Sequence, residues 1–314
     1  MLYDQPEAIS GVHLSYLKSG ADIISTASYQ ASRDGFTREG FSETGANDLL
    51  RRSVKIAMET RDSFWEANLL IESHHHDNRN HGDMDRGCAP PLVAASMGSY
   101  GAVLCNGAEF TGDFGDGVAK DPELLTGFHL ERMELLALEH PDLLLFETIP
   151  SLAEAQAIRQ AILKSRAHWE PVIPVMVSFS CATELTVCHG EPLADCVDVF
   201  VDLPEVVAVG VNCTAPHLVE GLLRSAKERL QLRGSEKALL CYPNSGEQWL
   251  ADERRFKEDP EVRQVEVFQT LTRRLLDQGL VHIMGGCCRT TPEIIREGVA
   301  NEIHGHNHRH HRVA

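Results

Sequence analysis

Residues 206–213 read Val-Val-Ala-Val-Gly-Val-Asn-Cys, and an amphipathic stretch that begins at Pro216 follows them closely. A short apolar run of this kind indicates a buried strand, and Pro216 marks the start of a helix that we expect to reach Leu230. A strand that passes directly into a helix is a building block of parallel sheets. The stretch therefore predicts a βα unit whose strand ends at Cys213.

Similar runs recur along the chain, separated by helical stretches. The predicted strands are 22–26, 92–97, 143–147, 172–178, 206–212, 238–242 and 281–285. Helix starts are indicated by Asp121 before Pro122 and by Ser151 with Glu154 three residues later. The alternation predicts an α/β fold, a (β/α)8 TIM-type barrel with parallel strands covered by helices. Its first strand is missing, because the first recognisable element, Pro6–Lys18, is a helix.

The composition indicates one soluble domain with a small-molecule substrate. With 314 residues, 43% of them hydrophobic, the chain can bury one large core. A net charge of −17 repels nucleic-acid phosphates and anionic lipid. No apolar stretch approaches the roughly 20 residues that cross a bilayer, and nine cysteines without a secretory signal indicate a reducing compartment. We expect a cytoplasmic protein without nucleic-acid or membrane partners; the sequence does not indicate its oligomeric state.

Two histidine-rich segments interrupt or follow the predicted domain. We place the barrel at 1–303, with an exposed insertion at 73–91 and a tail at 304–314 that we expect to be disordered. Both segments are polar and lack hydrophobic periodicity, so we interpret them as solvated loops rather than functional metal sites.

Residues 285–288 read Gly-Gly-Cys-Cys and join the last predicted strand to a helix, for which Thr290, Pro292 and Glu293 predict a capping box. Adjacent cysteines can both ligate one soft metal, whereas a disulfide between them needs a strained ring. Cys213, at the end of another strand, is the natural third ligand. Three thiolates around zinc leave one position open, as in catalytic sites. Two unrelated sites of buried cysteine are the alternative interpretation.

Six short motifs lie at the carboxyl ends of the predicted strands. They are Thr26-Ala27-Ser28-Tyr29-Gln30, Gly98-Ser99-Tyr100-Gly101-Ala102, Phe146-Glu147-Thr148-Ile149-Pro150, Gly210-Val211-Asn212-Cys213, Tyr242-Pro243-Asn244-Ser245-Gly246-Glu247 and Gly285-Gly286-Cys287-Cys288. Together and in this order they resemble the homocysteine S-methyltransferase family, from about Pro6 to about Gly298 apart from the insertion. The resemblance implies a (β/α)8 barrel with its active site at these strand ends.

The resemblance also implies a chemistry. In the family, three cysteines that match Cys213, Cys287 and Cys288 hold Zn²⁺, which activates the thiol of L-homocysteine as a thiolate. The thiolate takes a methyl group from a sulfonium donor and gives methionine, and no protein acid or base is needed because the donor leaves as a neutral thioether. Residues 98–102 and 107–112 look more like members that use S-methylmethionine or S-adenosylmethionine than like betaine or folate users.

Other residues are candidates for binding the two substrates. Glu147 matches the family glutamate that binds the amino group of homocysteine, and we expect Asn212 and Ser28 to line the same site. Tyr29 and Tyr100 are candidates for the donor, because an aromatic face attracts a sulfonium as it does other cations. The alternatives are a helix-start acid for Glu147, packing for Tyr29 and turn chemistry for Asn212.

One family motif, at the start of the barrel, has no counterpart in this sequence. Family members open with a strand that carries Asp-Gly-Gly, whose aspartate also contacts homocysteine, and nothing before Pro6 supplies it. A barrel without one strand exposes two unpaired edges. The alternatives to an efficient enzyme are thus a truncated or degenerate member that binds zinc with weak turnover, or a non-enzymic metal-binding protein. A thiol oxidoreductase would use Cys-x-x-Cys spacing, which is absent.

Overall fold

The fold centres on seven parallel strands that curl into an incomplete barrel. The computed structural model describes residues 1–74, 89–115, 121–166, 171–247, 249–250, 255–257 and 263–311. Within these ranges the strands are β1 (Ile23–Ser25), β2 (Leu92–Gly98), β3 (Leu143–Ile149), β4 (Val175–Phe179), β5 (Val206–Asn212), β6 (Ala238–Tyr242) and β9 (Ile283–Met284). They pair in that order, so the predicted strands and α/β class are confirmed.

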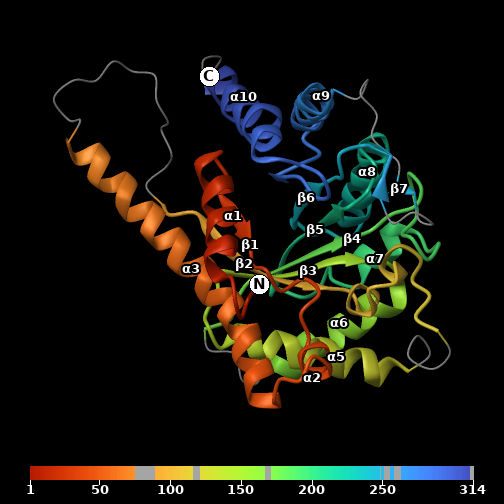
Figure 1. Ribbon diagram of the computed structural model, residues 1–314. Helices are drawn as coiled ribbons and strands as arrows, with labels where there is room; N and C mark the ends of the chain where they lie inside the picture. Colours follow the sequence, from red (N-terminus) through yellow and green to blue (C-terminus); the bar gives the residue numbers. More distant parts are fainter. Residues whose placement is uncertain are drawn as a thin grey trace.

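Helices cover the outside of the curled sheet. They are α1 (Pro6–Lys18), α2 (Arg33–Arg38), α3 (Glu43–His74), α4 (Tyr100–Leu104), η1 (Ala108–Phe110), α5 (Pro122–Ala137), α6 (Leu152–Ser165), α7 (Leu193–Asp198), α8 (Pro216–Leu232), α9 (Gln264–Asp277), η4 (Ile294–Ala300) and α10 (Asn301–His311). In Figure 1 the strands lie centrally, with α5 and α6 below them, α8 and α9 above, and the long α3 on the left. The Asp121 and Ser151 side chains cap α5 and α6, as predicted.

The strands bury two sets of side chains, because alternate residues point to opposite faces. Outward residues pack under the helices in the larger core, which includes Phe146, Val177 and Val209. Inward residues form a smaller cluster inside the curl. Its buried members are Ala94, Leu143, Leu145, Met176, Ala208 and Leu240.

The sheet ends at β1 on one side and β9 on the other, and these two strands do not pair within the described residues. Helix α1 links the two ends. It leads into β1, while its Tyr16 hydroxyl donates a hydrogen bond to the carbonyl of Thr290, beyond β9, at 2.7 Å. Tyr16 also packs in a cluster with Met284 of β9. Figure 1 shows α1 beside α3, with α10 above it.

Several local predictions need correction. The capping box at Thr290 and Glu293 does not form; Thr291 accepts the bond from Ile294 N instead, because the Thr290 hydroxyl is engaged by Cys287 O at 2.6 Å. The helix that the capping box was expected to start begins instead as a π-helical segment, η4, and continues as α10.

Three further findings concern predicted loops. Helix α10 crosses the boundary of the predicted tail and continues to His311, because Ile303 packs beside η4. A short antiparallel pair, β7 (Trp249–Leu250) with β8 (Arg255–Phe256), was not predicted. Residues 75–88 of the predicted insertion lie outside the described residues.

No helix in the described ranges is long and apolar enough to span a membrane.

Gly210 allows β5 and β6 to pair closely, because a Cβ there would overlap the carbonyl oxygen of Leu240. Gly210→Ala is therefore expected to lower the free energy of unfolding by about 3 kcal/mol, measured by urea denaturation. Gly127→Ala is the control, since a Cβ on that α5 residue meets nothing within 4 Å. It is expected to stabilise the protein by about 0.5–1 kcal/mol. Equal losses in both variants would contradict the interpretation.

Candidate active site

The inward-facing row of residues turns polar at the carboxyl ends of the strands. Its polar members are Ser96, Glu147, Ser178, Asn212 and Tyr242, on five neighbouring strands from β2 to β6. Most of them stand two residues beyond an apolar member of the inner cluster and therefore face the same interior. In barrels this end carries the active site.

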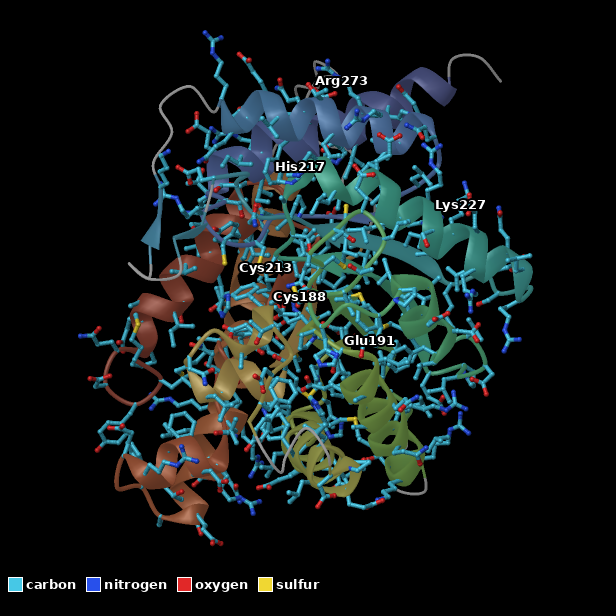
Figure 2. The ribbon with its side chains drawn as sticks, turned by 90° about the vertical axis from the view of Figure 1, so that its right-hand side faces the viewer. Cys188, Glu191, Cys213, His217, Lys227 and Arg273 are labelled. Atoms are coloured by element: carbon cyan, nitrogen blue, oxygen red, sulfur yellow. The ribbon has the colours of Figure 1, made fainter. Side chains whose placement is uncertain are left out.

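Three cysteines converge at this end. The sulfurs of Cys213, Cys287 and Cys288 all lie within 4.8 Å of one another, and the Sγ atoms of Cys213 and Cys288 are 3.2 Å apart. Hydrogen bonds from Cys213 and Cys287 lower the pKa of the Cys288 thiol. In Figure 2 Cys213 lies within the body of the molecule, whereas Lys227 and Arg273 lie on the outer helices α8 and α9.

Backbone hydrogen bonds hold the cysteine loop beside the loop that follows β6. Cys287 N donates to Pro243 O at 2.8 Å, and Ser245 N donates to Cys288 O at 3.0 Å. Cys213 N in turn donates to Tyr242 O at 3.1 Å. The three sulfurs are thus carried by loops that follow β5 and β9, and both loops are joined to β6 and its following loop.

An ion pair reinforces the same contact. Arg289, next to Cys288, donates through its guanidinium to the buried carboxylate of Glu247, which also accepts from the Ser245 hydroxyl at 2.9 Å. Arg289 itself has a φ of 61°, in the left-handed region. A charged hydrogen bond of this kind fixes the direction in which the cysteine loop leaves the sheet.

Asn212 ties three strand ends together. Its side-chain oxygen accepts from Thr148 N and from the Ser178 hydroxyl, both at 2.8 Å, and its Nδ2 donates to Thr148 Oγ1 at 2.7 Å. Thr148 has a φ of 60°, which is strained for a β-branched residue, and lies where the pairing of β3 and β4 shifts register. The fully buried Asn212 amide also lies 3.9 Å from the Cys287 sulfur.

Glu147 places a buried carboxylate near the cysteines. Burial raises the pKa of its carboxyl, and hydrogen bonds with Ser96 and Tyr242 partly oppose that rise. Cys288 and Arg132 are close enough to act on it electrostatically. A buried carboxylate with raised pKa becomes more favourable as an anion when a cation arrives beside it. The position thus suits a ligand with an ammonium group.

Arg132 of α5 is a buried cation that the sequence interpretation missed. Its guanidinium donates to the carbonyls of Gly98 at 2.8 Å, Tyr29 at 2.8 Å and Ser28 at 3.2 Å. Burial lowers the pKa of this group to about 10, so it stays charged at neutral pH. The signal was an arginine on the apolar face of a helix, three residues after the buried His129.

The remaining predicted site residues, Ser28, Tyr29 and Tyr100, have different surroundings. Ser28 is buried, and its hydroxyl donates to Ser96 O at 2.7 Å. The Tyr29 hydroxyl lies near the site, within electrostatic reach of Glu147 and Cys213, and burial raises its pKa.

The ring of Tyr100 packs edge-on against Phe114 and Phe128, 5.6 and 5.1 Å between centroids. The Tyr100 N–H donates to Glu154 at 2.6 Å. Tyr29 is within electrostatic reach of Cys213, and the donor-binding roles of Tyr29 and Tyr100 stay predictions.

The three thiols fit a soft metal ion. Zinc with bonds of about 2.3 Å to sulfur keeps tetrahedral ligand sulfurs roughly 3.8 Å apart. The separations here are compatible with that value, since one sulfur pair lies 3.2 Å apart and no pair is more than 4.8 Å apart. Small rotations of the side chains would suffice to hold the ion, with a fourth position left for a ligand.

Comparison with known proteins agrees with this geometry. A sequence profile described as homocysteine S-methyltransferase matches residues 1–301. Homocysteine S-methyltransferase 1 of Zea mays is 39% identical over 295 residues, which cover 94% of this chain and 84% of the relative. The chain belongs to the homocysteine S-methyltransferase family.

The chain is also similar to a second plant methyltransferase and to a solved bacterial structure. The selenocysteine Se-methyltransferase of Brassica oleracea var. italica is 39% identical over 299 residues, covering 94% of this chain and 79% of the relative. The oxidized form of the Escherichia coli homocysteine methyltransferase MmuM superposes with a TM-score of 0.72 at 30% identity, covering 96% of this chain and 86% of MmuM. A metallated form of MmuM gives a TM-score of 0.68, with the same identity and coverage.

The Glu247–Arg289 ion pair gives a test of how the family's cysteine loop is positioned. Glu247→Gln is expected to weaken binding of Co²⁺, a spectroscopic probe for the thiols, by about 10- to 100-fold, the usual effect of disturbing groups behind metal ligands. The measurement is a titration followed by the absorbance of the cobalt–thiolate complex. Glu123→Gln is the control, since that carboxylate pairs with Lys164 at the exposed surface of α5. Unchanged affinity in Glu247→Gln would show that the backbone bonds alone hold the loop.

Proposed function

We propose that this chain transfers a methyl group from S-methylmethionine or S-adenosylmethionine to the sulfur of L-homocysteine, with Zn²⁺ held by Cys213, Cys287 and Cys288. The observation that carries the proposal is the convergence of three thiols beside the buried Glu147 carboxylate, in a chain of the homocysteine S-methyltransferase family. When bound, zinc supplies an open coordination position at which a thiol is deprotonated at neutral pH.

The protein's own residues position the acceptor. Glu147 binds the ammonium group of homocysteine, held in place by Ser96 and Tyr242. Asn212 orients the Glu147–Thr148 turn and lies close to the Cys287 sulfur, so it acts through the backbone rather than by bonding the substrate's polar groups. Ser28 stabilises the same side of the site, because its hydroxyl donates a hydrogen bond to the Ser96 carbonyl.

The donor approaches from the side of Tyr29. An aromatic face beside a buried carboxylate attracts a sulfonium. Because the donor leaves as a neutral thioether, the residues need only align it with the attacking sulfur and exclude water. No proton-transferring residue is required.

Metal content tests the ligand set. The purified chain is expected to hold one zinc per molecule, and Cys213→Ser, Cys287→Ser or Cys288→Ser is expected to remove it, because two thiols hold zinc poorly. Cys105→Ser, at an exposed cysteine, is the control. Elemental analysis gives the metal content, and methionine formation is measured in parallel. Full zinc content in all three variants would refute this ligand set.

The same preparation separates the functional alternatives. Turnover with each sulfonium donor identifies the preferred one, and selenocysteine is offered as a second acceptor because a relative of equal identity carries that name. A non-enzymic metal-binding protein would lose most of its metal on deletion of 73–91 and the histidine-rich tail, whereas the enzyme keeps its zinc. Bound zinc with little turnover would identify a truncated or degenerate member of the family.

Glu147→Gln is expected to raise the KM for homocysteine by about 10- to 100-fold, the loss of one charged hydrogen bond. The KM for the donor and the zinc content should change little, because the substitution keeps the shape of the side chain and spares the cysteines. Steady-state kinetics with each substrate varied in turn measures both constants. An effect mainly on the donor would assign Glu147 to the other substrate.

A further inference from the structure

Glu109 is a further buried acid at this end of the barrel, besides Glu147 and Glu247, and neither the ligand set nor the acceptor site uses it. It lies on η1, between β2 and β3 in the sequence, and is 8% exposed. The Ser180 hydroxyl, just beyond β4, donates to the Glu109 carbonyl at 2.9 Å. A Cβ on Gly101 would come within 2.5 Å of Glu109 N, so the bare glycine lets η1 pack tightly against α4.

The carboxylate of Glu109 is incompletely satisfied. Its Oε2 is buried and has no hydrogen-bond partner among the described residues. The backbone N–H of Glu109 itself donates a hydrogen bond to the carboxylate, and Cys288 and Tyr29 lie within electrostatic reach, but neither of these side chains is a cation. Burying such an oxygen without a partner is unfavourable, and native proteins normally resolve it with water, an ion or a ligand.

The contrast with Glu147 shows what Glu109 lacks. Glu147 has hydrogen bonds with Ser96 and Tyr242, and the charge of Arg132 stabilises its anion. Both carboxylates lie within electrostatic reach of Cys288 and of the Tyr29 hydroxyl. Glu147 thus has side-chain hydrogen bonds and a nearby guanidinium, whereas the Oε2 atom of Glu109 has no hydrogen-bond partner among the described residues.

The proposed reaction brings two amino acids with cationic groups to this site. Homocysteine is a zwitterion with one ammonium and one carboxylate, whereas S-methylmethionine carries a sulfonium in addition to its ammonium and carboxylate and is a net cation. A single carboxylate cannot hold both substrates, since each must keep its own position for in-line transfer. A second buried carboxylate, Glu109, is available to oppose the additional positive charge of the sulfonium donor.

We propose that Glu109 binds the positively charged methyl donor and helps the site select it. This inference rests on the proposed methyl transfer. The carboxylate contributes a charged hydrogen bond or close ion pair to the bound sulfonium compound, and it remains unchanged through the reaction. Glu147 holds the acceptor, and the Tyr29 hydroxyl lies within electrostatic reach of both carboxylates.

The test compares Glu109→Gln with Glu147→Gln and with the exposed Glu123→Gln. Glu109→Gln is expected to raise the KM for S-methylmethionine by about 10- to 100-fold, as for the loss of one charged hydrogen bond. The KM for homocysteine should stay within about threefold of the parent value, a change worth less than one hydrogen bond. Glu147→Gln should show the reverse pattern, and Glu123→Gln should change neither constant.

Two further measurements keep the outcome independent of turnover. Calorimetric titration of S-methylmethionine into the zinc-loaded chain should show binding to the parent and much weaker binding to Glu109→Gln. The melting temperature of Glu109→Gln should equal or exceed that of the parent, because the substitution removes an unpartnered buried charge. A purely structural carboxylate would instead lower it.

The results test the proposed methyl transfer and the role of Glu109 separately. If the parent neither binds the sulfonium nor forms methionine, the proposed function fails. If the parent does both and Glu109→Gln retains its donor affinity, or if the loss falls mainly on homocysteine, the proposed function stands and the role of Glu109 is refuted.

Discussion

The side-chain amide of Asn212 ties together the carboxyl ends of β3, β4 and β5, and the candidate site depends on that link. Parallel strands leave their last backbone groups without ladder partners where the register shifts. The Asn212 side chain supplies the missing partners to Thr148 and thereby holds a left-handed, β-branched residue in place. Glu147 precedes Thr148 directly, and Cys213 follows Asn212, so one amide sets the relation between an acid and a thiol.

Backbone strain gathers around the same point. Thr148, Cys213 and Arg289 all have positive φ values between 49° and 61°. Such conformations cost free energy and persist only where the surroundings impose them. Here the surroundings are the Asn212 amide, the bond from Cys213 N to Tyr242 O and the Glu247 carboxylate. The strained positions coincide with the residues that carry the chemistry, or adjoin them, which is typical of a preorganised site.

Much of the architecture could be predicted from the sequence because strand and helix patterns differ in period. The apolar runs predicted the strands closely, and the residues that end them, Glu147 and Cys213, indicated where chemistry would gather. Contacts between distant segments could not be predicted. Arg132 binds three carbonyls from segments about 30 to 100 residues away in the chain, and no local pattern encodes that choice.

Local rules failed where a tertiary partner competed. Thr290 has the spacing of a helix cap, but the Cys287 carbonyl takes its hydroxyl and closes the cysteine turn. Tyr100 is a candidate for donor contact, and its ring also packs edge-on against Phe114 and Phe128, which lie after η1 and in α5. Neither the Cys287 carbonyl nor these two rings could be predicted as partners from the sequence.

The edge position of β9 gives the cysteines a second importance. Two residue pairs join β9 to β6, and the loop that follows it carries Cys287 and Cys288. An ion shared with Cys213 would clasp the last strand to β5 and close a loop of 75 residues. The three thiols would then also hold the edge strand β9 in the sheet. Loss of the metal would therefore be accompanied by local unfolding of that strand.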